Sequence, residues 1–318
     1  MTRFVIVTPN PAVDVTYTVD RQILGETLRV RDVRRVPGGK GLNVARVLES
    51  LGRDVVALQP LGGDAGRWMA GAITELGLPS VHCDVEGETR TTVAVVDGAM
   101  HPTLLAEPGQ GLTSHEWTRL AAALAETANR GDWVVIAGSF PPGSRAEHLE
   151  LLVGAAHTSG ALVAVDTSGD TLRAAASAGA DLIKANEAEI LDATGAGDPL
   201  EGMGRLARSG AIVMMSRGSD GAVLREPDGT MIEQPAVSGV SGNPTGAGDA
   251  ATAGLIAALA EGRTAQTALV WAALCGAAAV LRPDAGEIEL GALAELERSL
   301  APVDASFDAL HQQKRSQP

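Results

Sequence analysis

One aspartate, Asp249, follows a Gly-Ala-Gly turn at the start of a long alanine-rich stretch, in the sequence NPTGAGDAATAGLIAALAEG from Asn243. The first amide groups of a helix have no partner within the helix, and this end carries a partial positive charge. Glycines leave such amides accessible, so Gly246, Ala247 and Gly248 could bind a phosphate group. A carboxylate beside an anion costs electrostatic energy, which a general base in phosphoryl transfer would explain. We therefore predict that Asp249 takes a proton from a hydroxyl group that attacks a phosphoryl group.

The same five letters, TGAGD, also occur earlier in the chain, at Thr194–Asp198. The helix-like sequence EAEILDA precedes this copy, so its first glycine is expected to end a helix. Asp198 is followed by Pro199 and Glu201, a pattern typical of a helix N-terminus with proline at its first position. Pro199 also lacks the amide that an anion would bind. We therefore expect a structural role for the first copy and a functional site at the second.

Two other interpretations of the glycine-rich segments are weaker. GAGDAA from Gly246 satisfies the G-x-G-x-x-A dinucleotide fingerprint, but that fingerprint follows an early strand, whereas the polar VSGVSGNP precedes this one. GGKG does not form a phosphate-binding P-loop, because Gly41 stands where Ser or Thr would bind Mg²⁺. An NAD-dependent oxidoreductase is kept only as an alternative class.

Charge and composition limit the possible partners. The chain has 318 residues, with 25 Lys and Arg against 39 Asp and Glu, which gives a net charge of −14. Such a protein repels polyanions, so we expect no nucleic-acid partner, and local basic residues must hold any anionic substrate. Cys83 and Cys275 form no disulfide framework, and the longest apolar run, Ala268–Leu281, is shorter than the roughly 20 residues of a membrane span. We expect a soluble, cytoplasmic protein without a membrane partner.

The elements that must position Asp249 follow a regular order. Strand-like DWVVIAGS, ALVAVDTS, ADLIKAN and AIVMMSRG alternate with alanine-rich helical segments. Strands separated by helices predict βαβ units and a mostly parallel sheet. Ligands bind beyond the carboxyl ends of the strands in such sheets. We predict a single α/β domain over residues 1–318, doubly wound, with a polar tail at 303–318.

Two polar, alternating stretches interrupt this order. One runs from Thr16 to Val36 and the other from Thr89 to Gly109, with a hairpin expected around Asp97-Gly98. We predict that insertions at about 13–36 and 88–108 form a small projecting β-sheet, or lid. Ordinary edge strands of the main sheet are the alternative.

Three motifs, in this order, resemble the signatures of the PfkB/ribokinase family of sugar kinases: GGKGLNVARVLESLG, NEAE and PTGAGDAATAG. The resemblance extends from about Phe4 to about Leu300. It implies a ribokinase-like fold, ATP and Mg²⁺ as cofactors, and a β-sheet lid, which commonly serves as the dimer interface in this family. We therefore expect a homodimer that forms through the lid.

Further motifs are similar to the subgroup of this family that acts on sugar phosphates: TPNPAVD, ETR ending at Arg90, GSFPPG and DTSGD. The resemblance implies phosphorylation of a ketohexose phosphate to the 1,6-bisphosphate. NPTGAGDA looks most like tagatose-6-phosphate kinases, and LLAEPG lacks the Asn that fructose-1-phosphate kinases tend to have before Glu. We favour tagatose 6-phosphate or fructose 6-phosphate, with 1-phosphofructokinase activity on fructose 1-phosphate or a kinase for an unphosphorylated sugar as alternatives. Asn243 stands where some relatives have the Asp of a monovalent-cation loop, which leaves potassium dependence open.

The resemblance also implies roles residue by residue. Asp249 is the base, and the amides of Gly246, Ala247 and Gly248 stabilise the transferring phosphoryl group. The substrate-binding residues are Asp14, Gly38, Gly39, Lys40, Asn43, Arg90 and Ser139, of which Lys40, Arg90 and Ser139 form a phosphate clamp. The nucleotide-binding residues are Lys184, Asn186, Ser216, Gly218, Gly221 and Ala277.

Glu189 is expected in the outer coordination shell of Mg²⁺. A plain helix cap is the alternative for Asn186 and Glu189. A catalytically silent sugar-binding regulator is the alternative for the whole chain.

Overall fold

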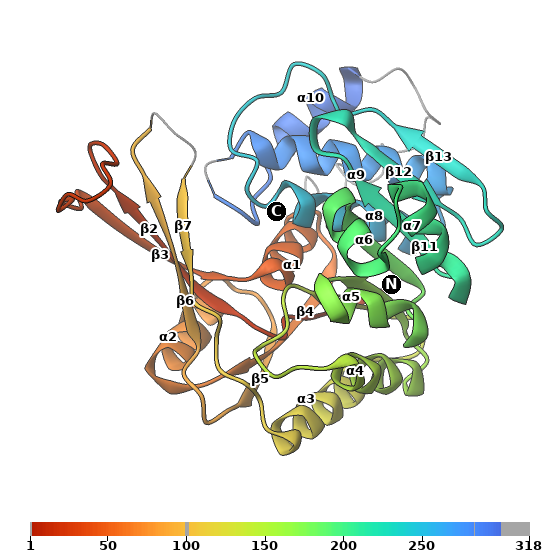
Figure 1. The fold of residues 1–318 in the computed structure, drawn as a ribbon, viewed down its shortest axis with the longest axis horizontal. Coiled ribbons are helices and arrows are strands. Elements are labelled where there is room, and N and C mark those ends of the chain that lie inside the picture. Colours follow the sequence, from red (N-terminus) through yellow and green to blue (C-terminus); the bar gives the residue numbers. More distant parts are fainter. Residues whose placement is uncertain (1, 99–101, 283, 300–318) are drawn as a thin grey trace, which may run out of the picture.

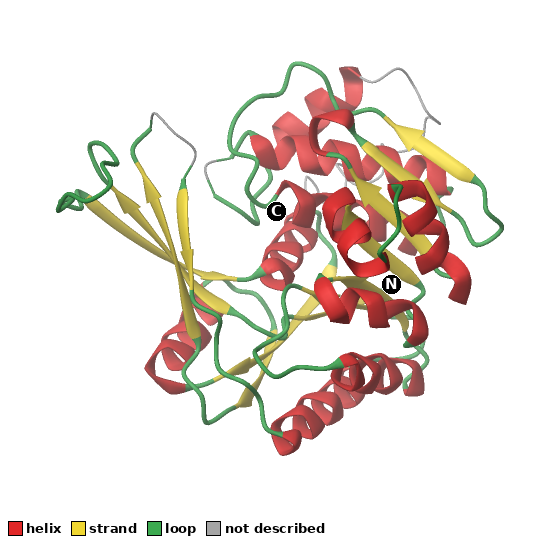
Figure 2. Cartoon of the chain, in the orientation of Figure 1, coloured by secondary structure: helices red, strands yellow, loops and turns green. Residues whose placement is uncertain are grey.

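The computed structural model describes residues 2–98, 102–282 and 284–299. Within these residues a nine-stranded sheet lies between two layers of helices, and a separate four-stranded sheet projects to one side (Figures 1 and 2). The predicted polar tail at 303–318 and the part of the second insertion at 99–101 lie outside the described residues.

The large sheet has the order β13-β12-β11-β10-β9-β8-β1-β4-β5. Its strands are β1 (Arg3–Val7), β4 (Asp54–Leu61), β5 (Ser80–Asp84), β8 (Trp133–Ala137), β9 (Leu162–Asp166), β10 (Leu182–Asn186), β11 (Ile212–Ser216), β12 (Ala222–Arg225) and β13 (Met231–Gln234). All pairs from β11 to β5 are parallel, whereas β12 and β13 add two antiparallel pairings at one edge. On one side of β1 lie β4 and β5, and on the other side lie the strands from β8 to β13, which follow later in the chain. The prediction of a doubly wound, mostly parallel sheet is confirmed.

Successive residues of a strand point to opposite faces of the sheet, so each face of this sheet carries apolar side chains, and helices cover both faces. In β1, Phe4 and Ile6 join one core, and Val5 and Val7 join the other. The first core also contains α1 (Lys40–Ser50), α2 (Gly63–Glu75), α8 (Ala247–Ala260), α9 (Ala265–Val280) and α10 (Leu290–Ser299). The second contains α3 (Ser114–Thr127), α4 (Ala146–Thr158), α5 (Gly169–Ser177), α6 (Glu187–Thr194) and α7 (Pro199–Leu206).

Short 3₁₀ turns follow α7 and β11, at Ala207–Ser209 and Gly218–Asp220. The longest apolar run, Ala268–Leu281, lies mostly in α9, which packs in the core. Among the described residues, none of the helices has both the length and the apolar character needed to cross a bilayer.

The small sheet has the order β3-β2-β6-β7 and consists of β2 (Ala12–Thr18), β3 (Asp32–Gly38), β6 (Arg90–Val96) and β7 (Thr103–Ala106). It is separate from the large sheet, so the projecting sheet is confirmed and the edge-strand alternative is wrong (Figure 1). At the end of the sheet nearest the rest of the protein, Ala12 pairs with both Gly38 and Arg90. Two insertions distant in sequence thus bring Asp14, Gly38 and Arg90 together.

The first TGAGD copy has the expected structural role. Gly195 ends α6 in the left-handed conformation, with φ of 62°. Asp198 caps α7, its carboxylate accepting the amide of Glu201 at 3.0 Å, and Pro199 is the first residue of that helix.

Candidate active site

The predicted site residues gather beyond the carboxyl ends of the parallel strands. Asn186 and Ser216 end β10 and β11 and lie in register with each other. Asp166 ends β9 opposite Ala137, the last residue of β8, and Ser139 follows two residues later. This is the edge at which doubly wound sheets bind ligands.

The second TGAGD copy forms the head of α8. Gly246 precedes the helix with φ of 83°, a conformation that favours glycine, and an added Cβ would lie 2.8 Å from the Cβ of Ala285. Ala247, Gly248 and Asp249 then form the first turn of the helix. The carboxylate of Asp249 thus lies in the same turn as the amides of Gly246, Ala247 and Gly248, of which that of Ala247 donates to the carbonyl oxygen of Pro244 at 3.2 Å.

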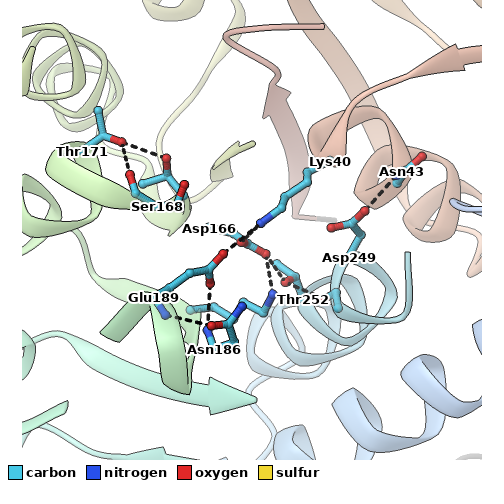
Figure 3. A network of polar contacts seen from close by, with 12 residues as sticks. Lys40, Asn43, Asp166, Ser168, Thr171, Asn186, Glu189, Asp249 and Thr252 are labelled. Atoms are coloured by element: carbon cyan, nitrogen blue, oxygen red, sulfur yellow. Dashed lines mark hydrogen bonds and ion pairs between the residues drawn. The ribbon is translucent and has the colours of Figure 1, made fainter. Parts of the chain in front are cut away.

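Asp249 is buried, with 6% of its surface exposed, and accepts a hydrogen bond from Nδ2 of Asn43 at 2.8 Å (Figure 3). Burial, together with the negative charge of Asp166, raises the pKa of Asp249 to about 6, against the opposing effects of Lys184, Asn43 and Lys40. A carboxylate with this pKa is ionised at neutral pH but is basic enough to accept a proton, which suits a general base.

A buried carboxylate that the sequence analysis assigned no role, Asp166, lies at the centre of the site. It is fully buried and accepts three contacts: Nζ of Lys184 at 2.9 Å, Nζ of Lys40 at 3.3 Å and Oγ1 of Thr252 at 2.9 Å (Figure 3). Thr252 lies in α8, one turn beyond Gly248, whose carbonyl oxygen is 3.0 Å from the same hydroxyl. Asp166 therefore connects β9 and β10 to the helix that carries the predicted base.

The charges in this cluster stabilise one another. Burial alone would raise the pKa of Asp166, but the ammonium groups of Lys184 and Lys40 hold that pKa below its ordinary value. The Asp166 carboxylate in turn raises the pKa of Lys40, although burial opposes the rise. Lys40 is therefore a cation at neutral pH, as a site for phosphate groups requires.

Lys184 also lies against the glycine turn. A Cβ added to Gly248 would lie 3.1 Å from Nζ of Lys184, so glycine allows the ammonium group to approach the first turn of α8. The first turn of α8 and a buried lysine thus lie next to each other. This geometry suits the predicted role of Lys184 at the nucleotide phosphates.

Asn186 and Glu189 form the helix cap that was the structural alternative. The side chain of Asn186 accepts the amide of Glu189 at 2.8 Å, and Oε2 of Glu189 accepts the amide of Asn186 at 2.8 Å. The other carboxylate oxygen of Glu189 lies 3.6 Å from Nζ of Lys40 (Figure 3). The cap thus holds a carboxylate at the rim of the lysine cluster, so a capping role does not exclude the predicted role in the site.

On the side of the small sheet, Asp14 lies against Gly38 and Gly39. A Cβ at Gly38 would overlap the Asp14 carboxylate, and the amide of Gly39 donates a hydrogen bond to it. Burial raises the pKa of Asp14 to about 6, although Arg90, Arg46 and the Gly39 amide oppose the rise. The glycine pair therefore makes room for a carboxylate that could accept sugar hydroxyl groups.

The predicted phosphate clamp divides into two parts. Arg90 and Ser139 both contact Asn10: the guanidinium donates to the Asn10 carbonyl oxygen at 3.0 and 3.2 Å, and the Asn10 amide donates to Oγ of Ser139 at 3.4 Å. Lys40 instead extends toward Asp166 and Glu189. The structure thus groups Arg90 with Ser139, and places the ammonium group of Lys40 in the lysine cluster.

The remaining predicted nucleotide residues lie around the same edge with fewer contacts. Ser216 ends β11, and Gly218, with φ of 56°, begins the turn that follows. Gly221 has φ of 92° and lies so close to the Gln234 carbonyl oxygen that a Cβ would overlap it, which explains this glycine without a ligand. Ala277 is buried in α9.

Comparison with known proteins agrees with this geometry. Residues 7–290 match the model of the pfkB family of carbohydrate kinases. The chain belongs to this family, and is therefore a phosphotransferase enzyme with a hydroxyl group as acceptor.

Its relatives include sugar-phosphate kinases. A 1-phosphofructokinase of Rhodobacter capsulatus is 35% identical over 95% of this chain and 94% of its own length. A 1-phosphofructokinase of Xanthomonas campestris is 36% identical over 82% of this chain and 85% of its own. Phosphofructokinase-2 from Escherichia coli, in complex with potassium, superimposes with a TM-score of 0.88 at 26% identity, covering 94% of this chain and 99% of that one. Its complex with fructose-6-phosphate gives 0.86 at 27% identity, with the same coverage.

Proposed function

We propose that this protein is a 1-phosphofructokinase, which transfers the γ-phosphoryl group of ATP to fructose 1-phosphate and forms fructose 1,6-bisphosphate. The observation that carries the phosphoryl-transfer chemistry is the buried Asp249 in the first turn of α8, directly behind the amides of Gly246–Gly248. Two buried or half-buried lysines face the same turn, which gives the site the positive charge that a protein of net charge −14 otherwise lacks.

The transfer follows from this arrangement. Asp249 accepts the proton of the sugar hydroxyl group as its oxygen attacks the γ-phosphorus, and Asn43 holds the carboxylate in place. The amides of Gly246, Ala247 and Gly248 donate to the oxygens on which charge develops, which requires that of Ala247 to exchange its present acceptor, the carbonyl oxygen of Pro244, for the phosphoryl group. One such donor is typically worth about 3 kcal/mol in the transition state. Lys184 and Lys40 neutralise the nucleotide phosphates, and the reaction needs no covalent enzyme intermediate.

The residues present are compatible with Mg²⁺ bound mainly by the nucleotide. Among the described residues no cluster of three or more His, Cys, Asp or Glu could hold a metal ion. Mg²⁺ typically binds one or two carboxylates together with substrate phosphates and retains several water molecules. Glu189, beside Asn186 at the rim of the site, is the carboxylate placed for such an outer contact. When bound, the ion would supply charge neutralisation of the phosphates.

The choice of sugar rests on the relatives. The similarity to two enzymes named 1-phosphofructokinase supports fructose 1-phosphate more strongly than tagatose 6-phosphate, which Asn-Pro before the glycine turn had favoured. Fructose 6-phosphate is a second candidate, because phosphofructokinase-2 from Escherichia coli has nearly the same fold and its structure contains this sugar phosphate.

A substrate panel tests this choice. We expect the highest kcat/KM with fructose 1-phosphate in a panel that also holds fructose 6-phosphate, tagatose 6-phosphate and unphosphorylated fructose, measured by coupled ADP release. Arg90→Ala should raise the KM for the sugar phosphate by about 10- to 100-fold, since hydrogen bonds to charged groups contribute about 1.5–3 kcal/mol.

Arg31→Ala is the matched control, because Arg31 is also on the small-sheet insertion but is exposed and pairs with Asp20. Its KM should stay within about twofold of the wild-type value, as expected for a surface pair. A higher kcat/KM for free fructose, or an unchanged KM for Arg90→Ala, would contradict a sugar-phosphate site at Arg90.

The pH dependence should reflect two carboxylates. Asp249 acts as a base only when ionised, so kcat should fall as the pH drops below about 6, where its raised pKa lies. Asp14 has the same pKa, and its protonation should instead raise the KM for the sugar phosphate. Steady-state kinetics at saturating ATP between about pH 5 and 8 separate the two effects. A kcat that stays constant over this range would contradict the role of Asp249.

We also propose that the small sheet is a lid and forms a homodimer interface. Leu104 and Leu105 of β7 are 57% and 60% exposed, and as neighbours in a strand they point to opposite faces. Exposed apolar side chains that cluster on one element indicate an interaction surface. Sedimentation should show that only one of the two variants, Leu104→Glu or Leu105→Glu, converts the dimer to a monomer. That variant should be the one whose substituted side chain faces the partner subunit. A monomeric wild-type protein would contradict the proposal.

A cytoplasmic location is consistent with this function. Both cysteines are free and buried, which suits a reducing compartment, and ATP is the proposed phosphoryl donor.

A further inference from the structure

Asn10 joins three segments that meet at the base of the small sheet. It lies three residues beyond β1, and its side-chain amide donates to the carbonyl oxygen of Pro108 at 3.1 Å and to Oγ of Ser139 at 3.4 Å. Its own carbonyl oxygen accepts Nε and Nη2 of Arg90. Asn10 is 8% exposed. The buried side chain of Asn10 thus connects the end of β1 to the loop after β8 and to the end of the second insertion, and its backbone carbonyl oxygen binds Arg90.

The contacts of Asn10 leave Arg90 partly available. A guanidinium group has five N–H donors. Two of them bind the Asn10 carbonyl oxygen, and one on Nη1 binds the carbonyl oxygen of Glu107 at 2.9 Å. One N–H on each terminal nitrogen therefore has no acceptor among the described residues. The contacts hold the guanidinium group in place, and one donor on each terminal nitrogen remains for a phosphate group, which arginine commonly binds.

Gly109 shows how closely the segments are packed. Its φ is 87°, and a Cβ there would overlap Oδ1 of Asn10 and lie 3.3 Å from Cδ of Arg90. Only glycine permits the chain after the small sheet to pass both side chains. A side chain that is held from several sides in this way has little freedom to move, so its partners are held in one geometry as well.

We propose that Asn10 is a positioning residue that holds Arg90 and Ser139 as one unit for binding the phosphate group already present on the sugar. The proposal rests on the proposed function as a sugar-phosphate kinase. Asn10 acts through Arg90 and Ser139: both hydrogens of its amide are used within the protein, and its carbonyl oxygen orients the guanidinium group.

Kinetics of Asn10→Ala test the proposal. We expect the KM for fructose 1-phosphate to rise about tenfold or more and the KM for ATP to stay within about twofold. The ratio of kcat/KM for fructose 1-phosphate to kcat/KM for free fructose should fall by the same factor by which the KM for fructose 1-phosphate rises. Asn129→Ala is the matched control, because the Asn129 amide also donates to a backbone carbonyl oxygen, that of Thr127, far from this cluster. Its kinetic constants should not change.

A double-mutant cycle separates positioning from a general loss of structure. If Asn10 acts through Arg90, adding Asn10→Ala to Arg90→Ala should raise the KM for the sugar phosphate little further, since residues in one network are not additive. Fully additive effects, a sugar-phosphate KM unchanged by Asn10→Ala, or an equal rise in both KM values would overturn the proposal.

If Asn10→Ala does not fold, Asn10→Asp replaces it, because it keeps the shape and removes both donors. It should raise the KM for the sugar phosphate at least as much, since it also adds a negative charge, and an unchanged KM would overturn the proposal. Failure of the proposed function is distinguishable, because it would appear in the wild-type protein as the absence of sugar-phosphate kinase activity.

Discussion

The Asp249→Asn variant should lose about 10²- to 10⁴-fold in kcat, the usual contribution of a general base, with the KM values for ATP and sugar phosphate little changed. The substitution keeps the size of the side chain and removes its negative charge together with its ability to accept a proton. The neighbouring carboxylate of Asp166 is already bound by Lys184, Lys40 and Thr252, so we do not expect it to act as the base in place of Asp249. Coupled ADP release at saturating substrates measures the effect.

The chain provides a matched control in its own first TGAGD copy. Asp198→Asn changes the same residue in the same five letters, but Asp198 caps α7, and Asn is as good a cap as Asp. Its kcat should equal that of the wild-type protein. Equal losses in the two variants, or a loss below about tenfold for Asp249→Asn, would remove Asp249 from the role of base.

The second large effect is expected at Asp166. Asp166→Asn removes the negative charge that Lys40 and Lys184 share in a fully buried position, and breaking a buried pair from one side typically costs about 3–5 kcal/mol of stability. The lysines would also lose the carboxylate that orients them, so the KM for ATP should rise. Denaturant unfolding and ATP titration measure the two effects.

Two control variants test the origin of the loss of stability in Asp166→Asn. Asp170→Asn changes the other aspartate of DTSGD, which is exposed and pairs with Arg173, so its effect on stability should stay within about 0.5 kcal/mol. Thr252→Val removes the hydroxyl contacts to Asp166 and to the Gly248 carbonyl oxygen and should cost about 1 kcal/mol. If Asp166→Asn lowered the free energy of unfolding no more than Thr252→Val does, the charge that Asp166 shares with the two lysines would not explain its contribution to stability.

The sequence was sufficient to predict features that depend on local patterns. Alternating strands and helices predicted the doubly wound sheet, because the order of elements alone favours parallel pairing. The structural role of Thr194–Asp198 followed from the cap pattern around Pro199, since capping involves residues only three or four apart. The small sheet could be separated from the large one because two alternating, partly polar stretches interrupt the regular order of strands and helices.

Features that depend on pairing between distant segments could not be predicted. DTSGD indicated an aspartate at a strand end, but Lys184 and Thr252, which surround Asp166, come from two other elements. Lys40 was expected beside Arg90, but its side chain extends toward Asp166 instead. A motif gives the position of a residue in a turn, and it does not give the direction of a long, flexible side chain. The choice between fructose and tagatose phosphates depends on one stereocentre and on which carbon carries the phosphate, and no short motif encodes that difference.

The attachment of the small sheet has a mechanical consequence. At the end where the sheet meets the rest of the protein, Ala12 of β2 pairs with both Gly38 of β3 and Arg90 of β6 (Figure 1). We expect any rotation of the sheet as a rigid body to displace these residues, which also surround the proposed sugar subsite. Occupancy of that subsite and the angle of the sheet would then be thermodynamically linked, because a bound sugar that contacts the sheet favours the orientation in which those contacts form.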